Sequence, residues 1–240
     1  MFDASSFIEE SAQKMKDEID DIAIIACSGG VDSTVAAVIA NQAIGDRLHC
    51  VYVDTGLMRK NETEEIQEML AAHGLNLTTV FAEDRYFEAL QGVTDPEQKR
   101  KIIGELFIRI FEDEQEKVGA KYLVQGTIAP DWIESGGGVR DTIKSHHNVG
   151  GLPDYMTLKV VEPLRSIFKD EVRRVGKALG IKPRILGRHP FPGPGLGIRI
   201  LGDITAEKVR ILQEVDAIFI GGLRDSGLYD EVWQLSLIHI

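Results

Sequence analysis

Apolar runs and amphipathic stretches alternate along most of the chain. Short runs rich in Ile, Val, Leu and Tyr predict strands at residues 22–27, 48–54, 77–81, 121–126 and 157–164. Helical spacing of apolar residues, with Asp95 as an N-cap and Gly180 as a C-terminal stop, predicts helices at 7–19, 33–44, 62–74, 95–111 and 169–180. Strand–helix alternation of this kind predicts an α/β fold with a mostly parallel sheet covered on both faces.

Two stretches interrupt this rhythm. Residues 126–154 are Gly-rich, polar and too long for a simple connection. Residues 188–197, RHPFPGPGLG, combine three prolines and three glycines and predict a stiff joint between domains. We therefore expect one domain at 2–189 and the start of a second at 190–240, with a strand at 198–201 and a helix opening at Thr205.

Composition narrows the class of protein. The 240 residues are 43% hydrophobic and carry a net charge of −11, which argues against nucleic-acid binding through a general positive field. Residues 1–20 lack the apolar core of a signal peptide, and no apolar run approaches the roughly 20 residues of a membrane span. Cys27 and Cys50 each lie in an apolar run, so buried free thiols are expected rather than a disulfide. These features predict a cytoplasmic protein that binds neither membranes nor nucleic acid.

The segment after the first strand, SGGVDST at residues 28–34, carries the chemistry. Ligands of parallel sheets bind where strands end and helices begin, and a helix N-terminus attracts anions. Two glycines allow close approach and positive φ, and three hydroxyls add donors. The segment predicts a phosphate cradle made by Ser28, Gly29, Gly30, Val31, Asp32, Ser33 and Thr34. A tight turn with a capped helix is the alternative interpretation.

This loop is neither a Walker A loop nor a GxGxxG motif. It resembles the SGGxDS pyrophosphate-binding loop (PP-loop) of the N-type ATP pyrophosphatases, which activate an oxygen with ATP before a nitrogen or sulfur nucleophile displaces AMP. Further stretches, VDTGLMRKNE, DPEQKRKIIG, QGTIAPDWIES, IKSHHNVGGLP, EPLRSIFKDEVR and RHPFPGPGLGIRILG, resemble the synthetase part of the GMP synthetases. The match is nearest to the separate synthetase subunit of the two-chain archaeal type.

The resemblance implies a Rossmann-like fold of the adenine nucleotide alpha hydrolase type. It also implies a ligase of purine biosynthesis that converts XMP, ATP and ammonia to GMP, AMP and pyrophosphate with Mg²⁺. A separate glutamine amidotransferase subunit would supply the ammonia. By resemblance, Arg100 and Gln234 contact XMP.

Position along the chain suggests roles for four more residues. Asp32 could cap the helix or hold Mg²⁺, and Asp131, just after the fourth strand, could position Mg²⁺ or the adenylating oxygen. Lys144 heads a glycine-bounded loop that could close over the polyphosphate, so Asp32, Asp131 and Lys144 are the expected catalytic residues. Asp54, at the end of the second strand, could face the nucleoside or simply cap a turn.

Several residues have simpler interpretations. Lys99, Arg100 and Lys101 open a helix against its dipole, which indicates either a phosphate partner or a solvated basic face. Adjacent His146 and His147 suit hydrogen bonding to a phosphate or the loop better than zinc. Tryptophans at 132 and 233 are more often core residues than ligand contacts.

The resemblance fades at the end of the chain. LSLIHI after DEVWQ does not follow the family pattern, which continues into a dimerisation domain. We therefore expect a truncated C-terminal domain and a weakened homodimer. Two other functions stay open, namely another N-type ATP pyrophosphatase, acting in NAD synthesis or tRNA thiolation, and a non-catalytic nucleotide-binding module.

Overall fold

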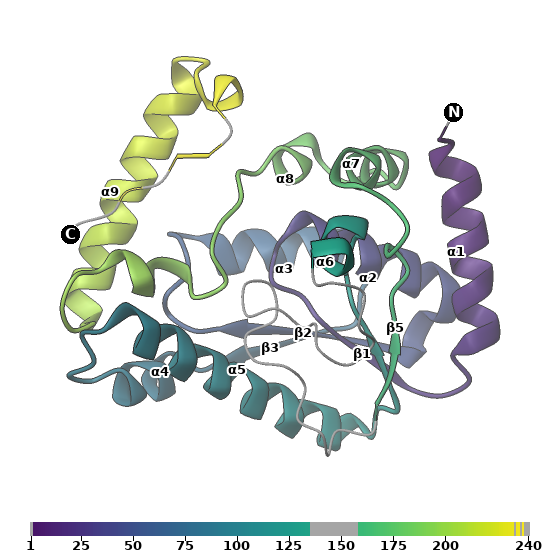
Figure 1. Cartoon of the computed structure of the whole chain (residues 1–240), viewed down its shortest axis with the longest axis horizontal. Helices are drawn as coiled ribbons and strands as arrows, with labels where there is room; N and C mark the ends of the chain where they lie inside the picture. The colour runs from purple at the N-terminus through teal and green to yellow at the C-terminus, as the bar shows by residue number, and fades with distance from the viewer. Residues whose placement is uncertain (1, 135–157, 233, 236, 238–240) are drawn as a thin grey trace.

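A computed structural model describes residues 2–134, 158–232, 234, 235 and 237. Its centre is a five-stranded sheet in the order β3-β2-β1-β4-β5, in which every neighbouring pair is parallel (Figure 1). The strands are β1 (Ala23–Ala26), β2 (Leu48–Asp54), β3 (Leu77–Phe81), β4 (Tyr122–Val124) and β5 (Lys159–Val161). The α/β fold with a parallel sheet is confirmed.

Helices cover both faces of this sheet (Figure 1). The α-helices are α1 (Ala4–Glu18), α2 (Val31–Ile44), α3 (Glu62–Ala72), α4 (Glu83–Ala89), α5 (Pro96–Val118), α6 (Ala129–Glu134), α7 (Lys169–Ala178), α8 (Pro183–Leu186) and α9 (Ala206–Asp225). Short 3₁₀ turns are η1 (Gly45–Arg47), η2 (Gly195–Arg199) and η3 (Tyr229–Glu231).

The alternation of side chains along the strands builds two cores. In β1, Ile25 packs into the core beneath α1, α2, α3 and α7, whereas Ile24 packs into the core on the α4–α5 side. In β2, Cys50 and Tyr52 face the first core, and Val51 faces the second. Successive side chains of a strand point to opposite faces, so strands that are apolar throughout require cover on both sides.

The predicted helices all form, with caps where the sequence placed them. Asp95 accepts a hydrogen bond from the Gln98 amide at 2.8 Å, and Thr205 accepts one from the Lys208 amide at 3.2 Å. The helix predicted to start at Ser33 begins two residues earlier, at Val31.

One predicted element is wrong. The apolar run at 198–201 is not a strand, because Gly195–Arg199 forms a 3₁₀ turn instead. Leu196 and Ile200 are buried in the core on the α4–α5 side, so their apolar character reflects burial in a turn. The short helices α4, α6 and α8 were not predicted, since helices of four to seven residues carry little periodicity.

The C-terminal part packs on the same core as the sheet. Leu196, Val209 and Leu212 join Ile24 and Val51 in one hydrophobic cluster. The proposed division at residues 189 and 190 stays a prediction.

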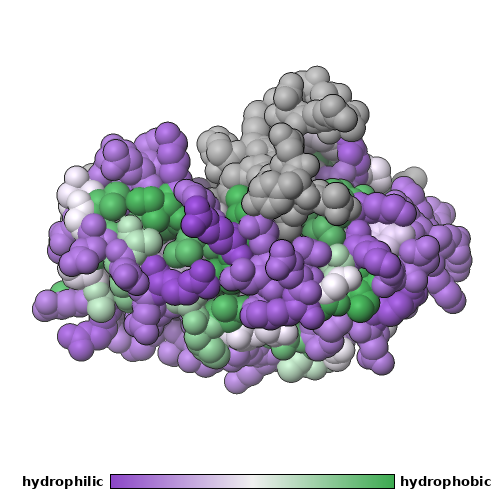
Figure 2. All heavy atoms as spheres, turned by 90° about the horizontal axis from the view of Figure 1, so that it is seen from below, coloured by the Kyte–Doolittle hydropathy of each residue, from purple (hydrophilic) through white to green (hydrophobic). Residues whose placement is uncertain are grey.

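The outer face of α9 keeps Ile211, Val215 and Ile218 exposed. Seen from below, the mostly hydrophilic surface is interrupted by hydrophobic areas, including one at the end where α9 lies (Figure 2). Among the described residues, no helix is long and apolar enough to cross a bilayer.

Candidate functional site

The predicted phosphate loop lies where the chain changes direction across the sheet. From β1 the chain winds outward through β2 to β3, and it then returns to β4 on the other side of β1. The carboxyl ends of β1 and β4 therefore flank a topological switch point, where parallel sheets bind ligands. The loops after these two strands are in contact, because a Cβ on Gly126 would lie 2.9 Å from the backbone of Asp32 and Ser33.

The two glycines of the loop do different work. Gly29 has a φ of +73°, and a Cβ there would also lie 2.3 Å from Ile66 Cδ1. Gly30 is the N-cap of α2 with a φ of −73°, so it needs no left-handed conformation. A Cβ on Gly30 would lie 3.3 Å from the Ser28 hydroxyl and 3.9 Å from the Ser33 hydroxyl, between the side chains expected to line the cradle. Gly29 is thus required for its positive φ, and the absence of a side chain at Gly30 leaves the space between the two serine hydroxyls open.

Three hydroxyls surround the start of α2. The Ser28 and Ser33 hydroxyl oxygens lie 3.3 Å apart, and the Ser33 hydroxyl donates to the Gly30 carbonyl at 3.2 Å. The Thr34 hydroxyl donates to the same carbonyl at 2.8 Å, and Thr34 is only 1% exposed. Ser28 and Ser33 therefore line the cradle, whereas Thr34 holds its backbone from inside. Val31 is buried in the core and offers the cradle only its backbone amide.

Asp32 is tied to the neighbouring helix. Its Oδ2 lies 2.6 Å from Lys169 Nζ, which stands on the first turn of α7. Its Oδ1 is buried and has no hydrogen-bond partner among the described residues. A carboxylate with one oxygen paired and one orphaned beside the predicted phosphate cradle fits a magnesium ligand, since Mg²⁺ is commonly held by one or two carboxylates plus substrate phosphates.

Asp54 has the capping role that the sequence left open. Its Oδ1 accepts from the Gly56 amide at 2.9 Å, and its Oδ2 accepts from the Thr63 hydroxyl at 2.8 Å. The Thr63 hydroxyl lies in turn 3.1 Å from that of Tyr52, whose pKa is raised by burial. Oδ1 thus caps the turn after β2, and Oδ2 joins the end of β2 to α3.

Asp131 caps a turn after β4. Its Oδ2 accepts from the Ile128 amide at 2.9 Å, within the segment that leads into α6. Next to it, Trp132 is 38% exposed, and its indole N–H donates to the Arg165 carbonyl at 3.0 Å. Residue 132 is therefore a surface residue, contrary to the core position expected for it.

The three basic residues that open α5 are separated by the fold. Lys99 is 1% exposed and donates from Nζ to the Ile200 carbonyl at 2.7 Å, so the solvated basic face is wrong for this residue. Burial lowers the pKa of Lys99, and the nearby Lys208 ammonium adds to that shift. Arg100 is exposed and paired with Glu97 at 3.1 Å.

Other candidates lie near or beyond the described part of the chain. Gln234 donates to the Pro190 carbonyl at 2.9 Å, which places it beside the Pro-rich joint. Lys144, His146, His147 and the tryptophan at 233 lie outside the described residues. Cys27 and Cys50 are buried and free, and a mutual hydrogen bond together with burial raises the pKa of Cys27. The expected free thiols are confirmed.

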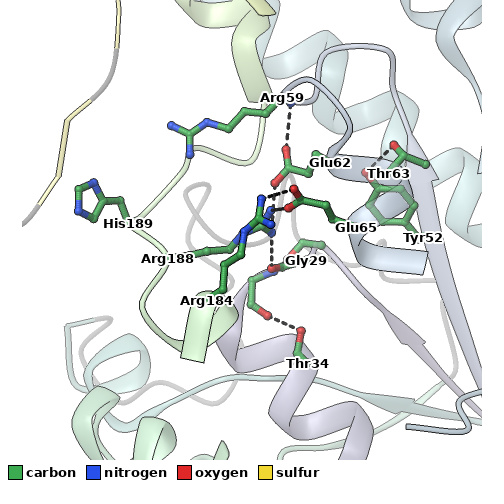
Figure 3. A network of polar contacts seen from close by, with 12 residues as sticks. Gly29, Thr34, Tyr52, Arg59, Glu62, Thr63, Glu65, Arg184, Arg188 and His189 are labelled. Carbon is green, nitrogen blue, oxygen red and sulfur yellow. Dashed lines mark hydrogen bonds and ion pairs between the residues drawn. The ribbon is translucent and has the colours of Figure 1, made fainter. Parts of the chain in front are cut away.

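The sequence did not point to Arg188, although this residue contacts the loop. Its Nη1 donates to the Gly29 carbonyl at 3.2 Å and lies 3.3 Å from Glu62 Oε1 (Figure 3). Its Nη2 lies 3.3 Å from Glu65 Oε2, and Arg184 pairs with the same carboxylate. Its place as the first residue of the Pro-rich joint is typical of a linker and does not by itself indicate a contact with the loop. The sequence does not point to Gly126 and Lys169 either, because their partners Asp32 and Ser33 are distant in sequence.

Comparisons with known proteins agree with this fold. A family model described as NAD synthase matches residues 3–110. Solved structures of an NMN synthetase from Francisella tularensis and an NH₃-dependent NAD synthetase from Campylobacter jejuni share the fold, with TM-scores of 0.64 and 0.60. The first covers 100% of this chain and 99% of its own, the second 100% of both, at 16% and 13% identity. Identity at that level supports the shared fold alone.

Curated relatives are much nearer in sequence. A glutamine-hydrolysing GMP synthase from Flavobacterium psychrophilum is 56% identical over 99% of this chain, and one from Christiangramia forsetii is 59% identical over 97%. The alignments cover 47% and 46% of those proteins, so the chain spans about half the length of these relatives. The chain is thus homologous, over almost all of its length, to one part of the GMP synthases.

Proposed function

We propose that this chain is the synthetase part of a GMP synthase, which adenylates O2 of XMP with ATP and then replaces AMP by ammonia. The relatives named above support this assignment across 97–99% of the chain. The observation that carries it is the loop after β1, which combines a helix start, a left-handed Gly29 and an uncovered Gly30 at a switch point. Such a loop suits the pyrophosphate that leaves during adenylation.

The loop would act mainly on charge. Pyrophosphate gains negative charge as it leaves, and amide donors fixed at the start of α2 stabilise that charge without rearranging. The hydroxyls of Ser28 and Ser33 lie close enough together to serve one phosphate group. When bound, Mg²⁺ would neutralise part of the polyphosphate charge, and Asp32 and Asp131 are the proposed residues to hold it. Asp32 would keep Lys169 as its second partner.

Arg100 and Gln234 remain the proposed XMP contacts, and Lys144 the proposed cation over the polyphosphate. Arg100 is exposed on the first turns of α5, where it pairs with Glu97. An ion pair between exposed side chains contributes little free energy, so Arg100 can exchange Glu97 for a phosphate at small cost. Ammonia would come from a glutamine amidotransferase, as a separate subunit or as another part of the same protein. Homodimerisation and a cytoplasmic location stay predictions.

The test is AMP formation from ATP, measured with and without XMP. We expect AMP release with XMP plus ammonium, and none when free glutamine replaces ammonium, because no glutaminase nucleophile motif is visible in this chain. An equal rate of AMP release with and without XMP would favour an enzyme with another acceptor, as in NAD synthesis or tRNA thiolation. A folded chain that binds ATP but never forms AMP would favour the non-catalytic module.

A further inference from the structure

The glycine peptides of the loop can each turn in two directions, and the direction decides whether the loop attracts or repels a phosphate. In a trans peptide, the C=O and the N–H point in opposite directions. The Gly29–Gly30 peptide lies between two residues without side chains, so a rotation that exchanges its two ends meets little steric resistance. When the N–H points toward the cradle, its partial positive charge attracts a bound anion. When the C=O points toward the cradle, its partial negative charge repels the anion.

Hydrogen bonds hold both glycine carbonyls away from the cradle. The Gly30 carbonyl accepts from the Thr34 hydroxyl, the Thr34 amide at 3.1 Å and the Ser33 hydroxyl, all inside the first turn of α2. The Gly29 carbonyl accepts from Arg188 at 3.2 Å. The amide of Gly30, on the opposite side of that peptide, donates to the Ser28 hydroxyl oxygen at 3.4 Å and so faces the predicted cradle.

Arg188 is itself held in place. Its side chain is 19% exposed and lies between Glu62, which is 7% exposed, and Glu65 (Figure 3). Glu62 Oε2 also accepts from the Arg59 amide at 3.0 Å, so this carboxylate is fixed to the backbone at the start of α3. Burial raises the pKa of Glu62, and the charge of Arg188 opposes that shift.

We propose that Arg188 is a positioning residue for the phosphate loop, which holds the Gly29 carbonyl outward so that the Gly30 amide faces the polyphosphate, with Glu62 orienting its guanidinium. This rests on the proposed function, because it assumes that ATP binds at residues 28–34. Arg188 does not touch the reacting atoms. It acts by keeping one peptide from turning.

Two variants separate anchoring from charge. Arg188→Met removes the donor and one positive charge, whereas Arg188→Met combined with Glu62→Gln removes the donor and leaves the local net charge unchanged. Arg184→Met is the matched control, since Arg184 pairs with the same Glu65, whereas the donor to the Gly29 carbonyl is Arg188. Thermal unfolding monitors folding, and Glu62→Gln alone supplies a second test if Arg188→Met does not fold.

The readouts are the Kd of a non-hydrolysable ATP analogue by calorimetry and the ¹H–¹⁵N resonances of Gly29 and Gly30. Hydrogen bonds to charged groups typically contribute enough to change affinity by about 10- to 100-fold, so Arg188→Met and the double variant should both weaken binding by that factor. Both should shift the Gly30 amide resonance, and Arg184→Met should change neither quantity. Glu62→Gln alone should give a smaller loss in the same direction.

Recovery of parental affinity in the double variant would show that charge rather than anchoring matters, and it would overturn the inference. Unchanged affinity and amide shifts in Arg188→Met would overturn it as well while leaving the proposed function intact. If the parent chain bound neither the analogue nor pyrophosphate, the proposed function would fail, and this inference with it.

Discussion

At the scale of single residues, the loop after β1 depends on two glycines, because a side chain at either position would obstruct it. Gly29 supplies a left-handed φ, and Gly30 leaves the space between the Ser28 and Ser33 hydroxyls open. Gly30 is exposed, whereas a side chain at Gly29 would meet Ile66 of the core. Substitution of Gly30 should therefore change ligand binding more than folding.

Gly30→Val should abolish ATP binding, because its branched side chain would occupy the space between the two serine hydroxyls. The φ of −73° at Gly30 is accessible to valine, so the variant should stay folded. Calorimetric titration with an ATP analogue, alongside circular dichroism, measures both effects. Parental affinity in folded Gly30→Val would place the phosphate site elsewhere.

Ser33→Ala should mainly slow adenylation, since it removes one donor from the cradle and leaves the amides of α2 in place. Loss of one such donor costs ~10²–10³ in rate at comparable sites. The rate of AMP release at saturating ATP measures the effect. An unchanged rate would mean that the hydroxyl only supports the Gly30 carbonyl, to which it donates at 3.2 Å.

Gly126→Ala should weaken ATP binding through the backbone. A Cβ at this position would lie 2.9 Å from the Asp32 carbonyl carbon and the Ser33 amide nitrogen, so the start of α2 would have to shift. A misplacement of about 1 Å can cost about 100-fold in catalysis. The affinity for the ATP analogue and the rate of AMP release check this. Gly221→Ala is the glycine control, because a Cβ there meets nothing within 4 Å and the position, like Gly126, has no positive φ.

At the scale of elements, α5 joins the C-terminal segment to the sheet through a buried cation. Lys99 reaches across to the Ile200 carbonyl just after η2, and burial lowers its pKa from 10.5. Lys208 repels this ammonium, and Asp203 partly offsets the repulsion. A sequence pattern of three basic residues does not reveal which one turns inward.

This burial predicts a pH-dependent stability difference. A lysine whose folded pKa is lowered contributes most to stability above its unfolded pKa, and the contribution falls as pH drops below about 10.5. The stability of the parent relative to Lys99→Met should therefore rise as pH increases from 7 toward 10. Urea unfolding at several pH values measures it, and Lys101→Met controls for loss of a positive charge on the same helix. A constant difference across this range would contradict the prediction.

At the scale of the whole molecule, two ion pairs link the segment after β2 to α9. Arg59 pairs with Asp216 at 3.0 Å, with side chains 16% and 3% exposed. Lys60 pairs with Glu214 at 2.6 Å, with side chains 42% and 53% exposed. The Arg59 guanidinium also stacks over the Phe191 ring, 4.4 Å from its centroid. Arg59, in the segment after β2, therefore contacts both α9, through Asp216, and the Pro-rich joint, through Phe191.

Breaking these pairs should have unequal effects. Asp216→Ala should reduce the free energy of unfolding by about 3–5 kcal/mol, because it leaves a largely buried Arg59 unpaired. Glu214→Ala should change it by less than about 1 kcal/mol, because both partners are solvated. Chemical denaturation of both variants provides the comparison. Equal small losses would show that Arg59 finds water or another partner when Asp216 is removed.

The sequence by itself determined the parallel α/β architecture and the glycine pair between β1 and α2, where we predict the phosphate loop. Strand runs that are apolar at every position require cover on both faces, and a glycine pair between a strand and a helix is a local signal. Asp95 could be named as a cap, and a helix could be placed from Thr205, because a cap acts within three residues. Each of these features depends only on residues that are close together in the sequence.

Only the tertiary structure decided which side chains meet. Arg188 and Gly29 are 159 residues apart, and Lys169 and Asp32 are 137 apart, so no local pattern joins them. The fold also turned Lys99 inward and placed a 3₁₀ turn, Gly195–Arg199, where a strand was expected at 198–201. Contacts of this kind depend on how elements pack, and packing is set by the whole chain at once.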